Sequence, residues 1–222
     1  MNAEVVKYFS VIGEATWQTL IMVFFSTIFG LLLGLPLGIF LCTSDPSTGL
    51  KPRKVMYQIL SIIINILRAI PFVILVILLF PFTRAILHTA IGTKASVVPL
   101  TIAAAPFVAR VIESSLKEVD PGVIQAARSM GSTNPQIIFK VLLPEALPSI
   151  INGITLTIIN LIGYSAMAGT VGGGGLGDVA IRYGYQRYRV EYMLGAVAII
   201  LILVEVIQLI GTKVANSMQA KR

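Results

Sequence analysis

Long apolar runs alternate with short polar segments along the whole chain. Several runs hold about 18 or more residues without a charge, enough for a helix to cross the roughly 30 Å hydrocarbon core of a bilayer. The pattern predicts an all-α, polytopic membrane protein whose 222 residues form one transmembrane domain. The predicted spans are residues 17–41, 55–82, 95–111, 149–170 and 192–211. One longer polar segment, residues 112–148, is predicted to be a loop between the third and fourth spans.

This polar segment begins with clear helix signals. Asp120 followed by Pro121 is typical of an N-cap with proline at the first helical position, where a missing N–H costs nothing. Ala126 and Ala127 favour the helix that follows. Gly131 is placed to end it in a left-handed conformation that a side chain would disfavour. The sequence therefore predicts a short helix ending at a glycine turn.

A second short helix is predicted directly after that turn. Thr133 or Asn134 before Pro135 gives its start, and Pro144 is expected to end it. Two short helices that meet at a glycine form a compact knob with little side-chain bulk. Such a knob is suited to docking into a groove on another protein.

The first predicted span carries a row of small residues. Gly30, Gly34 and Gly38 recur every four residues, a spacing that lets another helix approach closely. We expect this row to serve packing within the chain rather than a dimer contact. In the second span, Pro71 predicts a kink, and Arg68 is expected to reach the membrane surface.

The fourth predicted span is uncharged but has a polar face. At 100° per residue, five residues fall within an arc of about 80°. Polar residues of membrane helices tend to face the bundle interior or a water-filled cavity. The face is predicted to line a translocation path, with interhelical hydrogen bonding as the alternative. Its residues are Gly153, Thr157, Asn160, Tyr164 and Met167.

Composition agrees with a membrane protein and excludes several functions. Hydrophobic residues make up 56% and charged residues 12% of the chain, whereas a soluble domain carries about 25% charged residues. The net charge is +7, but the basic residues lie mostly in short loops and tails between apolar runs, so nucleic-acid binding is not expected. Cys42 and His88 are the sole residues of their types, which gives no intrachain disulfide and no metal-ligand cluster.

The distribution of Lys and Arg predicts the orientation in the membrane. With the N-terminus outside, the inner side holds ten such residues and the outer side six. This bias follows the positive-inside rule and places residues 112–148 and the C-terminus in the cytoplasm. The ten are Lys51, Arg53, Lys54, Arg110, Lys117, Arg128, Lys140, Lys213, Lys221 and Arg222; the six are Lys7, Arg84, Lys94, Arg182, Arg187 and Arg189.

No catalytic site is predicted. The glycine run at residues 172–175 could form a phosphate cradle, but no Gly-Lys-Ser/Thr follows and no strand precedes it. A tightly turning loop at the membrane surface is the better interpretation. Arg68, although expected to reach the surface, and Glu205 are the ionisable residues with buried-looking apolar surroundings, and they share no motif. ATP must therefore be hydrolysed elsewhere if the chain takes part in ATP-driven work.

The knob carries a recognisable motif. Gln125-Ala126-Ala127, three residues, Gly131, nine residues and Val141-Leu142-Leu143-Pro144 resemble the EAA loop of permeases from binding-protein-dependent ABC importers. The family pattern is Glu-Ala-Ala, three residues, Gly, nine residues, Ile, any residue, Leu-Pro. Gln125 stands for Glu and removes a charge, while Val141 stands for Ile and keeps the shape. The resemblance implies that Gln125, Ala126, Ala127, Gly131, Val141, Leu143 and Pro144 form the ATPase-coupling loop.

Three further segments resemble the methionine ABC-transporter permease: residues 67–72, 165–178 and 180–188. This resemblance implies a type I ABC importer permease fold, with a five-helix subunit in the bacterial inner membrane working as a homodimer. It implies two copies of a cytoplasmic ABC ATPase and an extracytoplasmic methionine-binding lipoprotein as partners. ATP and Mg²⁺ would bind the ATPase, and this chain would hold no cofactor.

Two alternatives stay open at this stage. One is a permease of the same architecture for another small solute, such as a polar amino acid or a phosphonate. The other is an intramembrane enzyme or a structural membrane subunit. An enzyme would need a paired acid and base or a metal cluster, and a structural subunit would not need the helix–Gly–helix loop.

Overall fold

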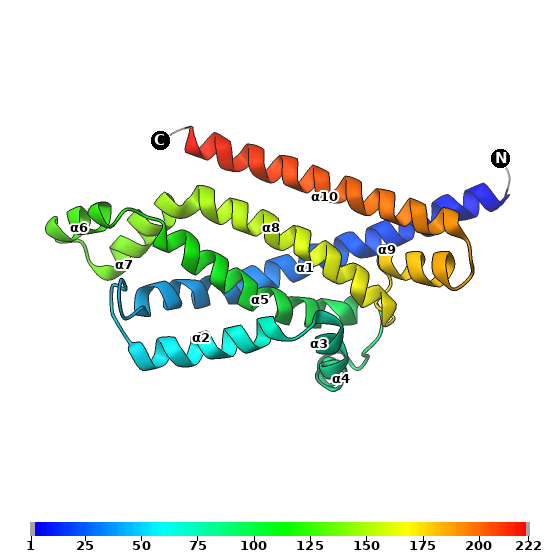
Figure 1. Cartoon of the computed structure of the whole chain (residues 1–222), viewed down its shortest axis with the longest axis horizontal. Coiled ribbons are helices and arrows are strands. Elements are labelled where there is room, and N and C mark those ends of the chain that lie inside the picture. The colour runs from blue at the N-terminus through cyan, green and yellow to red at the C-terminus, as the bar shows by residue number, and fades with distance from the viewer. Residues whose placement is uncertain (1–2, 221–222) are drawn as a thin grey trace. The chain divides into compact units, whose positions relative to one another are not determined.

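The computed structural model describes residues 3–220, and every regular element in that range is helical (Figure 1). The all-α prediction is confirmed. The long helices are α1 (Ala3–Ser44), α5 (Thr93–Lys117), α8 (Leu143–Thr170) and α10 (Val190–Gln219). The shorter elements are α2 (Lys54–Ala69), α3 (Phe72–Leu78), α4 (Phe80–Leu87), α6 (Pro121–Ser129), α7 (Asn134–Ile137), α9 (Gly175–Asp178) and the π-helical η1 (Ile138–Leu142) and η2 (Val179–Tyr185).

Four helical segments within residues 3–220 are long and apolar enough to cross a membrane. They contain α1, α5, α8 and α10, and the one that contains α8 begins at Asn134. The pair α2–α3 makes a fifth span if its bent halves are counted together. Each of the four segments extends beyond the predicted span, because the prediction followed uncharged runs and helices continue through charged ends.

The second predicted span is not one continuous helix. The chain bends by 102° between α2 and α3, far more than the predicted kink. Pro71 cannot donate a backbone hydrogen bond, and it disfavours helical geometry at the residue before it. Helix α2 therefore ends at Ala69 and α3 begins after Pro71. Helix α4 extends to Leu87, past the predicted end of this span at residue 82.

The chain divides into two compact units. The first unit comprises residues 70–104 and 158–208 together with the chain up to residue 30. The second unit comprises residues 31–69 and 105–157 together with the chain from residue 209. Helices α1, α5, α8 and α10 each contribute one part to each unit.

Apolar clusters and a stacked aromatic pair hold the first unit together. Phe72 of α3 stacks on Tyr164 of α8, with ring centroids 4.7 Å apart and planes 7° apart. A second cluster packs the start of α1 against α10 through Ile12 and Tyr192. This packing holds the start of α1, which begins at Ala3, well before the predicted span start at residue 17.

The glycine row of α1 packs within the chain, as predicted, and its partner is α5. In the first unit, a Cβ at Gly30 would lie 2.8 Å from the Cβ of Ala104. In the second unit, a Cβ at Gly34 or Gly38 would lie 2.6 Å from the nearest atom of α5. These distances allow no side chain larger than hydrogen, so the row serves close packing within the chain.

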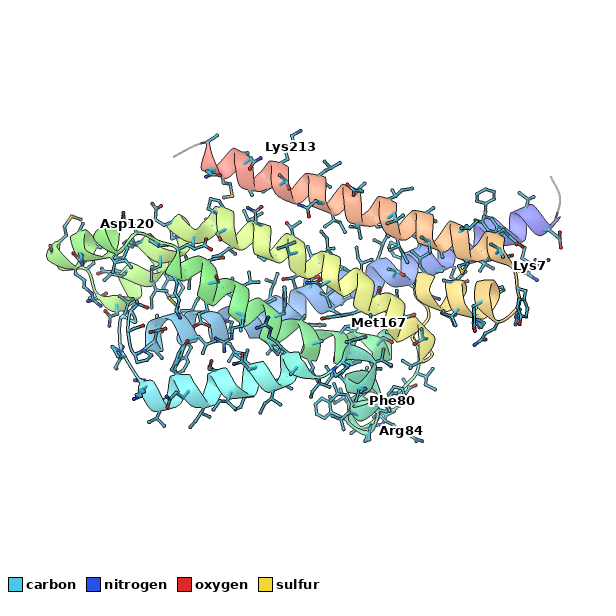
Figure 2. All side chains as sticks on the ribbon, viewed as in Figure 1. Lys7, Phe80, Arg84, Asp120, Met167 and Lys213 are labelled. Atoms are coloured by element: carbon cyan, nitrogen blue, oxygen red, sulfur yellow. The ribbon has the colours of Figure 1, made fainter. Side chains whose placement is uncertain are left out.

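Large apolar side chains are exposed along the long helices. Phe24 and Leu32 of α1 and Leu201 and Leu209 of α10 are each about 60% exposed or more. Side chains project from these helices into the surroundings, as Lys213 does from α10 (Figure 2). A lipid bilayer is the solvent in which such exposed apolar surface is stable.

Candidate functional site

The knob comprises α6, α7 and η1, between α5 and α8, and it starts as the sequence predicts. Asp120 caps α6 by accepting a 2.6 Å hydrogen bond from the Gly122 N–H, and Figure 2 marks it at the start of this helix. Gly131 follows the helix with a φ of 79°, in the left-handed region. The N–H of Ser132 bonds to the carbonyl of Ala127 at 3.1 Å, which closes the helix end. The predicted glycine turn is confirmed.

The second helix of the knob begins as predicted but does not end at Pro144. The side chain of Gln136 accepts hydrogen bonds from the N–H and hydroxyl of Thr133, at 2.8 and 3.0 Å. The helix then passes through η1 directly into α8, so the predicted end is wrong. In η1 the Leu143 N–H bonds to the Ile138 carbonyl, five residues back. This wider turn falls just before Pro144, whose missing N–H would otherwise break the helix.

Buried apolar residues anchor the knob within the second unit. Ala127 of α6, Ile137 of α7 and Leu142 of η1 belong to the same buried cluster as Ile112 and Leu116 of α5. Each of the three is at most 7% exposed. The knob is therefore packed on α5 rather than held only by its two ends.

The coupling residues predicted from the motif divide into exposed and packed positions. Gln125, Ala126, Gly131 and Pro144 are exposed, Val141 and Leu143 are half-buried, and Ala127 is buried. The sequence reasoning missed Met130 and Phe139, which are 83% and 65% exposed. Large apolar side chains in a polar loop were the signal that could have identified them.

One ion pair joins the turn after α1 to the end of α5 inside the second unit, and two more lie within α5. Lys117 Nζ lies 2.6 Å from Asp45 Oδ2 and 2.7 Å from Glu113 Oε1. Arg110 Nη1 lies 2.6 Å from Glu113 Oε2. Burial opposes ionisation of Asp45, but hydrogen bonds from Lys117 and Ser47 outweigh it and hold the pKa of Asp45 well below its usual range. Asp45 is therefore ionised at neutral pH.

Helix α2 adds a polar face to these ion pairs. The Tyr57 hydroxyl donates to Glu113 Oε1 at 3.0 Å. Arg110 donates to the carbonyl and hydroxyl of Ser61 and, at 3.0 Å, to Asn65 Oδ1. The three α2 residues are four apart and lie on one helix face. We call Asp45, Tyr57, Ser61, Asn65, Arg110, Glu113 and Lys117 the polar network.

The polar network contains buried carboxylates that the sequence reasoning missed. Asp45 and Glu113 are 6% and 4% exposed, whereas Arg68 and Glu205 are both exposed. Arg68 lies over the Phe107 ring, 5.8 Å from its centroid. The sequence could not show the network because Asp45 and Lys117 are 72 positions apart.

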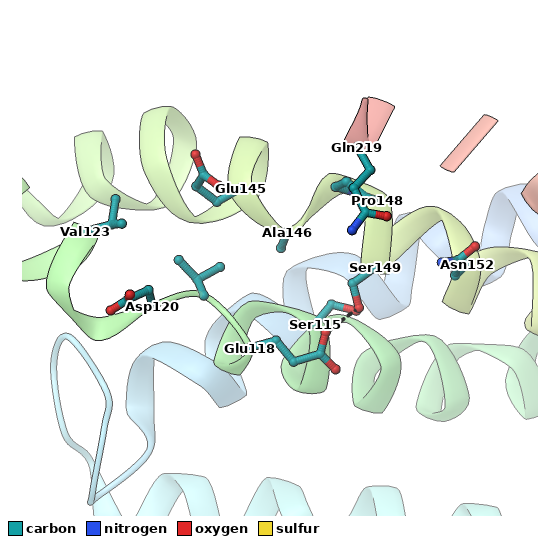
Figure 3. A pocket seen from close by; sticks show the side chains of 11 residues that line it. Ser115, Glu118, Asp120, Val123, Glu145, Ala146, Pro148, Ser149, Asn152 and Gln219 are labelled. Atoms are coloured by element: carbon teal, nitrogen blue, oxygen red, sulfur yellow. Dashed lines mark hydrogen bonds between the residues drawn. The ribbon is translucent and has the colours of Figure 1, made fainter. Parts of the chain in front are cut away.

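A pocket of about 400 Å³ lies beside the knob in the second unit (Figure 3). Glu118, Asp120 and Glu145 contribute carboxylates to its wall. The Ser149 hydroxyl bonds to Glu118 Oε2 at 2.7 Å and to the Ser115 hydroxyl at 3.0 Å. Among the described residues, no group of three or more His, Cys, Asp or Glu is placed to hold a metal ion.

The residues of the predicted path face lie in different environments along α8. Gly153 and Thr157, in the second unit, are buried, and Gly153 packs tightly on Val111. In the first unit Asn160 and Met167 are exposed (Figure 2 labels Met167), and Tyr164 is half-buried in its stack on Phe72. Packing inside the chain already occupies part of this face, so Asn160 and Met167 are its exposed members.

The glycine-rich run forms a packed strap in the first unit rather than a phosphate cradle. The Gly175 N–H donates to Gln18 Oε1 at 2.8 Å, and the Leu176 N–H donates to Thr19 Oγ1 at 2.9 Å. These bonds use the backbone N–H groups that a phosphate would need. We call residues 172–178 the glycine strap.

Known proteins place this geometry in a family. The profile described as "binding-protein-dependent transport system inner membrane component" matches residues 30–219. The chain belongs to this family. As an inner-membrane transport component it is a permease subunit, which agrees with its apolar helices and with the knob between α5 and α8.

Individual members of the family are similar over most of the chain. A probable D-methionine transport system permease protein of Vibrio cholerae is 53% identical over 197 residues, covering 89% of this chain and 87% of that protein. The corresponding protein of Pasteurella multocida is 46% identical and covers 95% and 96%. The D-methionine transport system permease protein of Escherichia coli is 49% identical and covers 70% and 71%.

Solved structures share the fold. A structure of the MetNI methionine ABC transporter in inward-facing conformations matches with a TM-score of 0.93 and 43% identity, covering 98% of this chain and 99% of that one. An amino acid ABC transporter solved with histidines has a TM-score of 0.75 at 23% identity, which supports the fold alone. The predicted type I ABC importer permease fold is confirmed.

Proposed function

We propose that this chain is the permease subunit of an ATP-driven methionine importer. The observation that carries the proposal is identity of 46–53% to D-methionine permeases over nine-tenths of the chain. The knob fits the same role, since a permease must receive mechanical work from a separate ATPase. The chain contains no Gly-x-x-x-x-Gly-Lys-Ser/Thr sequence of its own.

The knob is the proposed docking element for that ATPase. Gln125 and Ala126 give it a small polar face, while Met130 and Phe139 offer apolar side chains that a groove could enclose. Exposed aromatic and methionine side chains supply much of the binding energy at such contacts. Because Ala127, Ile137 and Leu142 fix the knob to α5, a push on the knob moves α5 as well.

The exposed members of the α8 polar face are the proposed contacts for substrate. Asn160 offers an amide and Met167 a thioether, and α8 carries no charge between Glu145 and its end. A zwitterion with an apolar side chain could pass such a surface in a hydrated cavity. A solute with net charge would find no counter-charge there, and desolvating it would cost several kcal/mol.

The assembly we propose is a homodimer of this chain with two cytoplasmic ATPase subunits and an extracytoplasmic methionine-binding lipoprotein. The transporter that matches at a TM-score of 0.93 supports a complex with an ATPase. ATP and Mg²⁺ would bind the ATPase subunits, where they supply the energy for transport. Selectivity would reside mainly in the lipoprotein.

Uptake of labelled methionine tests the proposed function. Cells that lack their own methionine carrier receive this permease together with its ATPase and lipoprotein. We expect uptake that excess unlabelled methionine abolishes and that lysine or glutamate leaves unchanged. A signal that lysine or a phosphonate removes, and methionine does not, would keep the family and overturn the substrate.

The proposed orientation places the N-terminus outside and the C-terminus in the cytoplasm. It rests on the ten-to-six bias of Lys and Arg, to which Lys221 and Arg222 contribute although they lie outside the described residues. A reporter fused after the last residue should report a cytoplasmic location, and one fused before the first residue an extracytoplasmic one. Both termini on one side would contradict five spans.

A further inference from the structure

The polar network lies close to the knob along the chain. Lys117 is the last residue of α5, and Asp120, the cap of α6, follows soon after. The same network reaches back along α5 to Arg110 and across to α2 and the turn after α1. One end of the network therefore adjoins the start of the proposed docking element.

The network is balanced in charge and directional. Two buried carboxylates, Asp45 and Glu113, are matched by Lys117 and Arg110, with ion-pair distances of 2.6 and 2.7 Å. Charge-assisted hydrogen bonds of this length are short and geometrically specific. Sliding α2 along α5 would break the hydrogen bonds of Tyr57, Ser61 and Asn65. Sliding the turn after α1 would separate the buried Asp45 carboxylate from Lys117.

The apolar contacts of the knob and the polar network constrain α5 in different ways. The apolar contacts of Ala127 and Ile137 link the knob to α5, but apolar contacts are not directional. The polar network instead fixes α5 to α2 in one register, through Tyr57, Ser61 and Asn65. Helix α5 is therefore attached to the knob by apolar packing, to α2 by hydrogen bonds, and to the turn after α1 by the Lys117–Asp45 ion pair.

We propose that Asp45, Glu113 and Lys117 are positioning residues that make α2 and the turn after α1 move together with α5 when the knob is displaced. ATP-driven movement of the knob then reaches two helices rather than one. The inference rests on the proposed function and adds a transmission route to it. A pair that only stabilises the fold would change protein yield or melting temperature and leave the coupling of ATP hydrolysis to uptake intact.

The test separates transport from ATP hydrolysis in the complete transporter reconstituted in lipid vesicles. Asp45→Asn combined with Lys117→Gln removes both ion pairs of Lys117 without leaving an unpaired charge, since Glu113 keeps Arg110. We expect ATP hydrolysis within about twofold of wild type and methionine uptake per ATP lowered roughly tenfold, within the range of coupling changes produced along such networks. Lys117→Arg keeps the cation and should keep the wild-type ratio.

A matched control uses an ion pair of equal length in the first unit. Arg182 and Asp178 lie 2.6 Å apart, four positions apart on the chain, and the arginine is half exposed. Asp178→Asn combined with Arg182→Gln should leave uptake per ATP unchanged. A fall equal to that of the Asp45 and Lys117 variant would show a general effect of lost ion pairs and overturn the proposal.

Unchanged methionine uptake per ATP in the Asp45 and Lys117 variant would also overturn the proposal. If that variant fails to assemble, Tyr57→Phe decides instead, because it removes only the 3.0 Å hydrogen bond to Glu113 and keeps the ring. About a twofold fall in uptake per ATP supports the proposal, and an unchanged ratio rejects it. A wild-type transporter that takes up no methionine would overturn the proposed function, and this inference with it, before any variant is compared.

Discussion

Gly131 in the knob and Gly175 in the glycine strap have the same φ, 79°, but very different surroundings. A Cβ at Gly131 would meet nothing within 4 Å. A Cβ at Gly175 would lie 2.7 Å from Thr19 Oγ1 and 2.8 Å from Met22 Cε. The knob needs glycine only for its backbone conformation, whereas the strap needs it for packing as well.

The difference indicates what each region does. In the strap, the N–H groups of Gly175 and Leu176 donate to the side chains of Gln18 and Thr19. The strap is therefore packed within the first unit. The knob leaves Met130 and Phe139 exposed and buries only the residues that hold it to α5. A region with open space around its turn and exposed apolar side chains is suited to a partner, and one without them is suited to stability.

The largest effect is expected for Gly175→Val. Valine would destabilise the folded state by about 1–2 kcal/mol through its left-handed backbone and by about 1–3 kcal/mol through overpacking. The free energy of unfolding should fall by the sum, measured as a lower melting temperature of the detergent-solubilised protein. Stability equal to that of Gly131→Val would show that the strap is not packed as described.

Gly131→Val is expected to cost about 1–2 kcal/mol of stability, from the backbone term alone. The protein should still insert in the membrane, because nothing surrounds the turn. Methionine uptake should fall and binding to the ATPase should weaken, as measured by co-purification. Normal uptake with normal ATPase association would contradict the coupling role of the knob.

Phe139→Ala should leave the melting temperature unchanged, since this side chain is 65% exposed. Affinity for the ATPase should fall by about 1–2 kcal/mol, which corresponds to roughly tenfold in dissociation constant. Phe24→Ala on α1 is the matched control, because Phe24 is 61% exposed outside the knob. Equal loss of affinity in both variants would remove the distinction between knob and membrane surface.

The smallest effect is expected for Gln125→Glu, which restores the family pattern. Gln125 is exposed, so the fold should not change. A carboxylate that finds a basic partner on the ATPase makes a stronger hydrogen bond than an amide, worth about 1 kcal/mol. Titration of the permease with ATPase should show unchanged or several-fold tighter binding, and clearly weaker binding would mean that the partner groove is adapted to glutamine.

Local chemistry explains which features the sequence could predict. The helix caps at Asp120 and Thr133 and the turn at Gly131 involve residues close in sequence. Their roles therefore follow from the order of residues along the chain. The end of the second helix was mistaken because a π-helical turn before Pro144 accommodates the missing N–H, and no short pattern predicts that turn. The spacing of Gly34 in its glycine row predicted close approach of another helix, but it did not identify α5 as that helix.

Features that depend on distant residues were missed. The polar network brings Asp45 to Lys117 and Tyr57 to Glu113 across 72 and 56 positions. The predicted path face assumed one environment along α8, whereas Gly153 is buried by Val111 and Met167 is exposed. Periodicity places residues on a face of a helix but does not identify what packs against that face.

Cross-linking from two highly exposed positions tests the central claim most directly. Met130→Cys in the knob and Tyr188→Cys, at positions 83% and 89% exposed in the two units, are each made with Cys42→Ser to remove the native thiol. A thiol-reactive photo-cross-linker is attached and irradiated in membranes that contain the ATPase. We predict an adduct with the ATPase from position 130 and none from position 188. An adduct from position 188, or none from position 130, would contradict the assignment of the knob as the docking element.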